Sequence, residues 1–165
     1  LRTLLAPRYY NALVLTETID REEAIQLYKF FVTQFVIDNQ SPNRRIFDSL
    51  ETFQEFFEKD KKEVTIGVYG VLSDVTNGKF FFRKDSCLYA DAIVDLPDKT
   101  VKYLVCCYVV FQAAVARSHG NFILTMKHTI VEGDPYCDCI IHDTNIEWNL
   151  EHPPKECWDN IEPKK

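Results

Sequence analysis

Six side chains that can act as acids, bases, nucleophiles or metal ligands crowd into twelve residues near the end of the chain. They are His128, Glu132, Asp134, Cys137, Asp138 and Cys139. The tripeptide Gly133-Asp134-Pro135 is typical of a tight turn, because it combines an unhindered residue, a side chain that caps its own backbone and a fixed φ. The apolar residues on both sides predict two strands between Phe122 and Asp143. We expect this hairpin to supply part of any chemistry.

These groups could support nucleophilic or acid–base chemistry. The candidates are Cys137 and Cys87 as nucleophiles, Asp134, Asp138 and Glu132 as bases, and His128 as the group that moves the proton. A cysteine attacks well only as a thiolate, and acidic neighbours raise the pKa of a thiol. The acidic surroundings of Cys137 therefore weigh against its thiolate and favour a carboxylate base.

Each candidate also has a purely structural explanation. Cys137 and Cys139 are small apolar side chains that suit a core, and Asp134 suits a turn. On alternating strand geometry Asp138 points away from the face that the two cysteines share. An acidic residue at such a position is unfavourable unless it is paired or exposed, so Asp138 is the hardest of these residues to explain by structure alone.

Cofactor chemistry has less support in the sequence. Cysteine, histidine and aspartate are zinc ligands, but Cys137-x-Cys139 with one histidine lacks the paired two-residue spacing of a structural zinc site. With five glycines and no phosphate-binding loop, nucleotide binding is poorly supported, and there is no Gly-x-Ser-x-Gly motif. We expect no cofactor, with zinc as the minor alternative.

The elements that would position the hairpin are mostly helical. A short helix is expected within residues 8–16. Apolar spacings of three and four residues predict amphipathic helices after Asp20 and after Ser49, both of which suit an N-cap. Residues 88–96 suit a short helix. The segment 101–120 predicts one continuous buried helix that is capped by Asp98 or Thr100 and ended by Gly120.

A change to alternating, β-branched residues predicts strands within 64–75 and 79–83, joined at Thr76-Asn77-Gly78. We therefore expect an α+β fold, in which N-terminal helices and a buried central helix pack on a mostly antiparallel sheet. We expect one domain over residues 1–165 with an irregular C-terminal tail, 144–165. Trp148 and Trp158 are expected to fasten this tail to the body.

The composition of the chain limits where the protein can act and what it can bind. Hydrophobic residues make up 46% of the chain, which indicates a globular protein, and the net charge of −6 argues against nucleic-acid binding. The longest apolar run, 101–116, is shorter than the roughly 20 residues that cross a bilayer. With no signal-peptide pattern, we expect a cytoplasmic protein with reduced cysteines that binds a small molecule and no membrane. Homo-oligomerisation is left open.

The run GDPYCD, residues 133–138, stands before alternating apolar residues and after an apolar strand. With the order of the elements, it resembles the L-2-amino-thiazoline-4-carboxylic acid hydrolase family, and similar spacing occurs in small vinyl-reductase-like ligand-binding domains. The resemblance covers Ile19 to His142. It implies hydrolytic opening of a cyclic amidine, an aminothiazoline carboxylate that becomes N-carbamoyl-cysteine. The matched motif positions are Gly133, Asp134, Cys137 and Asp138, and Cys87 and Cys107 match the family's other cysteines more loosely.

The chain also departs from the family pattern. Cys139 and Ile140 stand where the family usually has an aromatic and a basic residue, and the central helix lacks an acidic residue shortly after its cysteine. These differences concern the substrate more than the fold. We assign substrate binding to Glu132, Tyr136, Cys107 and Tyr108. The alternatives are a non-catalytic small-molecule-binding domain of the same fold and a structural or interaction protein.

Overall fold

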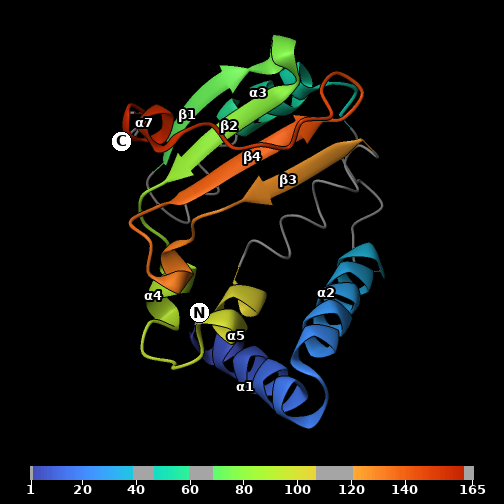
Figure 1. Ribbon diagram of the computed structural model, residues 1–165, viewed down its shortest axis with the longest axis vertical. Coiled ribbons are helices and arrows are strands. Elements are labelled where there is room, and N and C mark those ends of the chain that lie inside the picture. Colours follow the sequence, from blue (N-terminus) through green and yellow to red (C-terminus); the bar gives the residue numbers. More distant parts are fainter. Residues whose placement is uncertain (1, 39–46, 60–68, 107–120, 162–165) are drawn as a thin grey trace.

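The computed structural model (Figure 1) describes residues 2–38, 47–59, 69–106 and 121–161 and combines helices with one antiparallel sheet. The helices are α1 (Arg2–Thr18), α2 (Arg21–Asp38), α3 (Leu50–Lys59), α4 (Leu88–Ala92), α5 (Lys99–Val105) and α7 (Lys155–Asp159). The strands are β1 (Tyr69–Asp74), β2 (Lys79–Lys84), β3 (Phe122–Met126) and β4 (Cys137–Asp143), and short 3-10 turns cover Val75–Asn77 (η2) and Ile130–Glu132 (η3). The predicted α+β class is confirmed.

The helix starts follow the predicted N-caps. Asp20 Oδ1 accepts hydrogen bonds from the N–H groups of Glu22 and Glu23 at 3.0 and 3.1 Å, and α2 begins directly after it. Asp98, one of two candidates, caps α5 by accepting from the N–H of Val101 at 2.9 Å. Helix α1 is longer than the expected 8–16, since it runs from Arg2 to Thr18.

The prediction of one continuous helix over 101–120 is wrong at Cys106. Helix α5 ends at Val105, and the backbone of Cys106 is extended, with φ −70° and ψ 170°. Valine, tyrosine and cysteine have only moderate helix propensity, so local preference alone does not carry the helix past Val105. Val105 and Cys106 both lie in the core. Residues 107–120 lie outside the described part of the chain.

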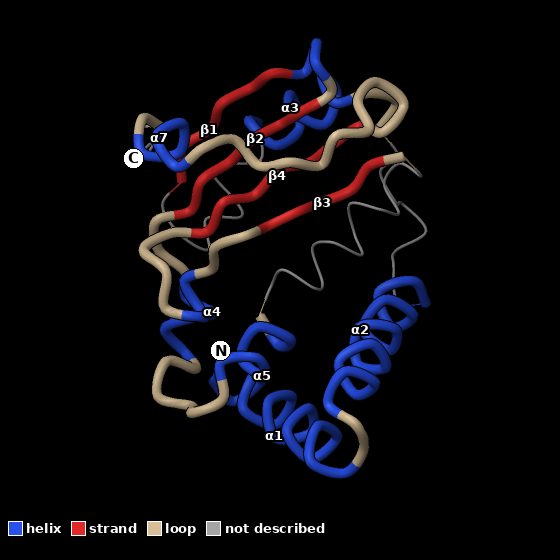
Figure 2. The backbone as a smooth tube through the Cα atoms, viewed as in Figure 1, coloured by secondary structure: helices blue, strands red, loops and turns tan. Residues whose placement is uncertain are grey.

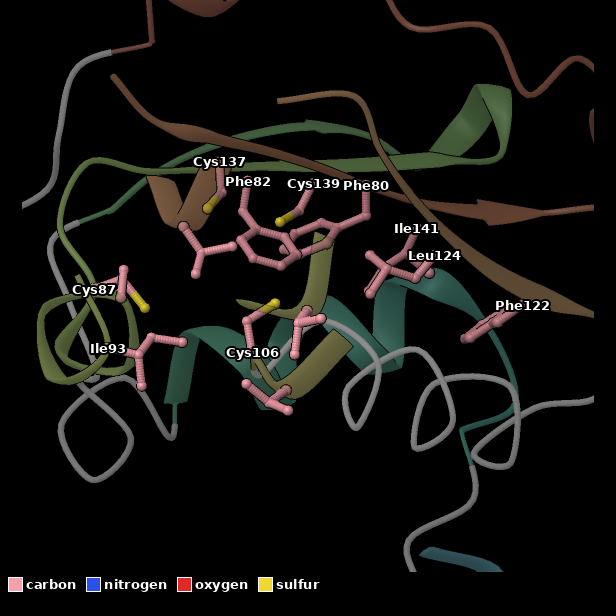
Figure 3. Packing of buried hydrophobic residues seen from close by; sticks show 14 of the residues in the cluster. Phe80, Phe82, Cys87, Ile93, Cys106, Phe122, Leu124, Cys137, Cys139 and Ile141 are labelled. Carbon is pink, nitrogen blue, oxygen red and sulfur yellow. The ribbon is translucent and has the colours of Figure 1, made fainter. Parts of the chain in front are cut away.

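The sheet is antiparallel throughout its described pairs, in the order β1-β2-β4-β3. Its central strand β4 is buried along its whole length. One face carries the main core, which includes Phe80, Phe82, Leu124, Ile141 and four cysteines, Cys87, Cys106, Cys137 and Cys139 (Figure 3). Helix α3 covers part of this face, where the ring of Phe53 meets the rings of Phe80 and Phe122.

The opposite face is covered by the C-terminal segment, which crosses in front of the sheet (Figure 2). A second apolar cluster forms there from Phe81, Tyr136, Ile140, Trp158 and Ile161. Trp158 is 1% exposed and fastens the tail as predicted. The same prediction is wrong for Trp148, which is 81% exposed, and the expected irregular tail includes the short helix α7.

The predicted hairpin has a longer connection than a tight turn. Strand β3 ends at Met126, and residues 127–136 form a loop that contains η3 and Gly133, whose φ is 104°. Strand β3 does not extend further toward the turn, because side-chain oxygens capture the backbone N–H groups that a strand would use. Asp138 binds the N–H groups of Lys127 and His128, and Asp134 binds that of Thr129.

Within the described residues, no helix has the length and apolar character needed to cross a membrane.

The start of the tail packs against the turn between β1 and β2, and this gives a stability test. Gly78 has a φ of 71°, and a Cβ there would lie 2.9 Å from Ile146 Cβ. Gly133 also has a positive φ, but a Cβ there would meet only Lys99 Nζ, at 3.7 Å. A positive φ costs a non-glycine residue about 1–2 kcal/mol. We therefore expect Gly133→Ala to lower the free energy of unfolding by about this amount and Gly78→Ala to lower it by more. Urea unfolding measures both, and equal losses would contradict the packing of Ile146.

Candidate functional site

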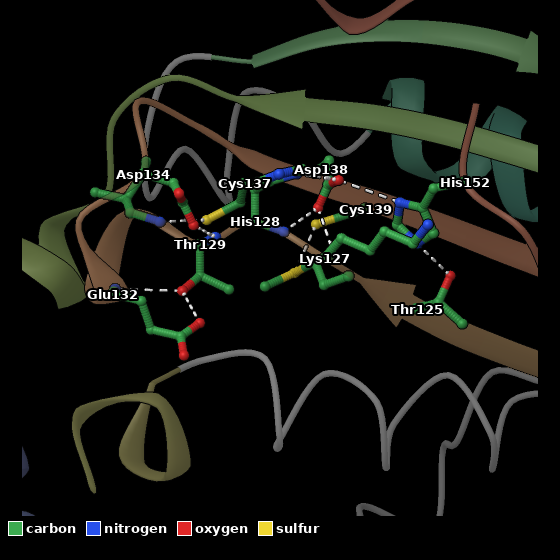
Figure 4. Close-up of polar contacts among 12 residues, drawn as sticks. Thr125, Lys127, His128, Thr129, Glu132, Asp134, Cys137, Asp138, Cys139 and His152 are labelled. Carbon is green, nitrogen blue, oxygen red and sulfur yellow. Dashed lines mark hydrogen bonds and ion pairs between the residues drawn. The ribbon is translucent and has the colours of Figure 1, made fainter. Parts of the chain in front are cut away.

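A buried carboxylate lies at the centre of the candidate site (Figure 4). Asp138 is 1% exposed and accepts four hydrogen bonds. Its Oδ1 accepts from the N–H groups of Lys127 and His128 at 2.8 and 2.7 Å. Its Oδ2 lies 2.8 Å from Nδ1 of His128 and 3.2 Å from Nδ1 of His152. Two imidazoles therefore share one carboxylate oxygen.

This environment keeps Asp138 charged. Burial acts to raise its pKa, but the hydrogen bonds from His152, His128 and Lys127 outweigh burial and lower the pKa below its ordinary value. The paired residue on β2, Arg83, donates instead to Asp85 and to the carbonyl oxygen of Trp158. The charge of Asp138 is thus balanced mainly by hydrogen-bond donors.

His128 is the solvent-accessible member of this group. Its side chain is 48% exposed, whereas that of His152 is 3% exposed. An ionised carboxylate accepts hydrogen bonds and donates none, so Nδ1 of His128 must carry the hydrogen that faces Asp138. The lone pair of a neutral ring then lies on Nε2. A base of this kind, oriented through its other nitrogen, suits proton abstraction from water.

The tail side of the site contains residues to which the sequence interpretation gave no role. Nε2 of His152 lies 2.9 Å from Oγ1 of Thr125, and the same oxygen lies 2.8 Å from Nε2 of His142. His142 is fully buried, and burial together with Lys79 and His152 lowers its pKa to about 4. Asp138, His152, Thr125 and His142 therefore form one continuous chain of hydrogen bonds.

The other two predicted acids hold the loop 127–136. Asp134 accepts from the N–H of Thr129 at 2.8 Å, and its own N–H donates to the carbonyl oxygen of Thr129 at 3.1 Å. Glu132 accepts from the hydroxyl of Thr129 at 2.6 Å, while that hydroxyl caps η3. Both carboxylates are therefore engaged in fixing the backbone beside His128.

Tyr136 lies at the end of this loop, on the same side of the sheet as Asp138. Its ring centre is 6.1 Å from that of His128, and the guanidinium of Arg83 lies 4.8 Å from the tyrosine ring. Burial and the nearby Asp159 and Asp138 raise its pKa. Tyr136 therefore stays protonated at neutral pH, and its ring lies beside His128 and Arg83.

The cysteines lie on the opposite, core side of the sheet. Burial raises the pKa of Cys137 to about 11, and its Sγ accepts a hydrogen bond from the N–H of Ile130 at 3.3 Å. Burial also raises the pKa of Cys139, whose Sγ lies 3.1 Å from the sulfur of Met126. Cys87 shares this core. All five described cysteines are free thiols.

The structure therefore brings together two of the predicted catalytic residues, His128 and Asp138, and places Asp134 and Glu132 in the adjoining loop. It places Cys137 and Cys87 in the core on the other face. Of the predicted substrate-binding residues, Tyr136 lies beside the pair, and Cys107 and Tyr108 lie outside the described residues. The catalytic and binding roles of all these residues stay predictions.

A zinc site was the minor alternative for the same residues. Over the part of the chain that the structure describes, no three histidine, cysteine, aspartate or glutamate side chains are arranged to hold a metal ion. The role of metals stays untested.

The sequence of the chain matches a known protein family. Residues 5–141 match the family of L-2-amino-thiazoline-4-carboxylic acid hydrolases, and the chain belongs to this family. The matched region includes β3, the loop 127–136 and most of β4, and thus both His128 and Asp138. No curated protein matches the chain significantly.

The charge of Asp138 gives a prediction about stability. Folding lowers the pKa of Asp138, so the ionised carboxylate stabilises the fold at pH values above its ordinary pKa of 3.8. This stabilisation is lost as the pH falls through the folded-state pKa. Hydrogen bonds to charged groups contribute about 1.5–3 kcal/mol each, so we expect Asp138→Asn to lower the free energy of unfolding by at least about 3 kcal/mol at neutral pH. The difference from wild type should narrow in acid. Urea titrations across this range measure it, with exposed Asp48→Asn as the control, and a pH-independent difference would contradict the account.

The placement of the thiols gives a second prediction. Cys157 is exposed on α7, whereas Cys137 and Cys139 are buried and have raised pKa values. We expect iodoacetamide at neutral pH to modify Cys157 in the native protein and to reach Cys137 and Cys139 only after unfolding, as read by peptide mass spectrometry. Cys157→Ser is the control for the first label. Rapid native modification of Cys137 would support a thiolate nucleophile instead.

Proposed function

We propose that the protein hydrolyses a small cyclic amidine and that His128, held by Asp138, is the general base that activates water. The family supports the reaction class. The observation that carries the residue assignment is a buried, charged carboxylate 2.8 Å from Nδ1 of a half-exposed imidazole. This arrangement orients the ring, fixes its tautomer and stabilises the positive charge that the ring acquires on taking a proton.

The reaction consumes one water and conserves all atoms. Nε2 of His128 takes a proton as the water oxygen attacks the carbon bonded to two nitrogens and sulfur in a 2-aminothiazoline-4-carboxylate. In N-carbamoyl-cysteine both nitrogens remain on that carbon, so the bond that breaks is the carbon–sulfur bond. The departing sulfur takes a proton, for which protonated His128 is the available donor. The second proton of the water moves from the oxygen to the ring nitrogen as the carbonyl group forms. In a cyclic amidine without sulfur, the leaving atom would be nitrogen.

Attack by water is a better proposal than attack by a cysteine. A thiol with a pKa of about 11 holds very little thiolate at neutral pH, and Cys137 sits in the core cluster rather than beside His128. Cys87 belongs to the same cluster. We therefore assign Cys137 and Cys87 to packing in the core, on the other face of the sheet from Asp138. We assign Asp134 and Glu132 to holding the loop that carries His128.

The proposal is tested by replacing the base while keeping its hydrogen bond. In His128→Asn, the amide nitrogen can still donate to Asp138, but the side chain has no basic nitrogen. General-base catalysis contributes typically about 10²–10⁴-fold, so we expect turnover to fall by that factor while the stability in urea stays near that of wild type. The assay is mass spectrometry on 2-aminothiazoline-4-carboxylate and a panel of cyclic amidines and lactams.

The outcomes separate the candidate functions. Turnover by wild type that persists unchanged in His128→Asn would reject His128 as the base. A folded wild-type protein that binds a panel compound by calorimetry and returns it unchanged would favour the ligand-binding domain of the same fold.

A further inference from the structure

A second imidazole, from the C-terminal segment, reaches the carboxylate that orients His128. Nδ1 of His152 lies 3.2 Å from Oδ2 of Asp138, and the histidine side chain is 3% exposed. His152 lies beyond the residues that match the family, which end at 141. The contact therefore joins a segment outside the matched region to the centre of the candidate site (Figure 4).

The tail is held in place on both sides of this contact. Trp158 is buried against Phe81, and its carbonyl oxygen accepts from Arg83 at 2.7 Å. The ring of His152 lies 6.0 Å from that of Trp158. At its start, the tail is fixed by Thr144, whose N–H and hydroxyl both donate to the carbonyl oxygen of Asn121 at 3.0 Å. His152 is thus presented to Asp138 by a segment anchored at either end.

The donors around Asp138 bind different oxygens of its carboxylate. The two backbone N–H groups bind Oδ1, and the two imidazoles bind Oδ2. Donors on both oxygens restrict rotation of the carboxylate about the Cβ–Cγ bond. Among the described residues, His152 is the donor to Oδ2 that does not depend on His128. His152 therefore sets the direction in which Oδ2 meets the ring of His128.

The far side of His152 is fixed as well, and the hydrogen bonds there can be ordered. Because Nδ1 of His152 donates to Asp138, Nε2 of the neutral ring is an acceptor, and the hydroxyl of Thr125 donates to it. A hydroxyl has one hydrogen, so the ring of His142 must donate from Nε2 to Thr125. Nδ1 of His142 then carries a lone pair. It is buried and has no partner among the described residues.

The opposite order is unfavourable. If His152 carried a hydrogen on Nε2 as well, Nε2 would donate to Oγ1 of Thr125, and the buried ring would be positively charged. The neutral ring avoids this buried charge. This order leaves His152 as a donor to Asp138 and keeps both of its ring nitrogens occupied.

We propose that His152 is a positioning residue for the His128–Asp138 pair, and that Thr125 holds its ring from the other nitrogen. The inference rests on the proposed function for its kinetic part and on the geometry alone for its structural part. The C-terminal segment then completes the site from outside the family-matched region, by setting the carboxylate that orients the base. His152 touches neither water nor substrate in this scheme.

Two amide variants separate the two contacts of His152. In His152→Asn, the amide nitrogen stands near the place of Nδ1 and can still donate to Asp138. In His152→Gln, the amide reaches toward Thr125 and leaves Oδ2 of Asp138 without this donor. We expect kcat to stay near the wild-type value for the asparagine variant and to fall about 10- to 100-fold for the glutamine variant, with KM little changed, because small misplacements of a catalytic group cost this much. Trp148→Ala, in the same segment and exposed, is the control.

The structural readout is the nitrogen NMR of the imidazole rings, which needs no substrate. In wild type we expect the Nδ1–H tautomer for His128 and His152 and the Nε2–H tautomer for His142. In His152→Gln, the His128 ring should show a mixture of tautomers, whereas His152→Asn and Trp148→Ala should keep the wild-type pattern. Thr125→Val, which removes the hydroxyl at similar volume, should keep the Nδ1–H tautomer of His152, because Asp138 still accepts from Nδ1.

The combined outcomes keep the two proposals distinct. Loss of turnover in His128→Asn with an unchanged kcat and unchanged His128 tautomer in His152→Gln would overturn the positioning role and leave the function standing. A wild-type protein without turnover, whose His128 tautomer nevertheless depends on His152, would overturn the function and leave the positioning role standing. Equal loss of kcat in the asparagine and glutamine variants would also overturn the positioning role.

Discussion

The arrangement of this site depends on one buried negative charge. Asp138 lies in the central strand of the sheet under the C-terminal segment, where an unpaired carboxylate would cost several kcal/mol. Its four donors come from two separate parts of the chain, the loop after β3 and the tail. The loop leaves the strand geometry so that two backbone N–H groups can converge on Oδ1. The tail crosses the sheet so that an imidazole can reach Oδ2.

Strand β4 supports two different environments because its side chains alternate. Cys137, Cys139 and Ile141 face the apolar core, while Asp138, Ile140 and His142 face the tail. The same burial that raises the pKa of the thiols would raise that of the carboxylate, and only the hydrogen bonds around Asp138 reverse this effect. Cys137 and Asp138, adjacent in sequence, therefore have opposite protonation states at neutral pH.

Local signals predicted those parts of this structure that depend on a few neighbouring residues. The N-cap at Asp20 and the opposite orientations of Asp138 and Cys137 follow from short-range geometry, and the structure agrees. The extended backbone at Cys106 does not follow from the sequence pattern, because the apolar run continues through this residue. His142 could have been associated with Asp138, since residues four apart on a strand share a face. His152 has no comparable signal, because the segment before α7 has no periodicity that would reveal which residue returns to the sheet.

The two imidazoles on Asp138 can divide their tasks because their exposures differ. A ring that is bound at both nitrogens cannot take a proton from water without breaking a hydrogen bond, and His152 is in that condition. His128 is bound at Nδ1 by Asp138, is half-exposed, and has a free Nε2 in the described structure. The same carboxylate oxygen thus supports one ring that can exchange protons with a substrate and one ring that cannot. Under the proposed function, burial by the tail, rather than residue type, determines which histidine serves as the base.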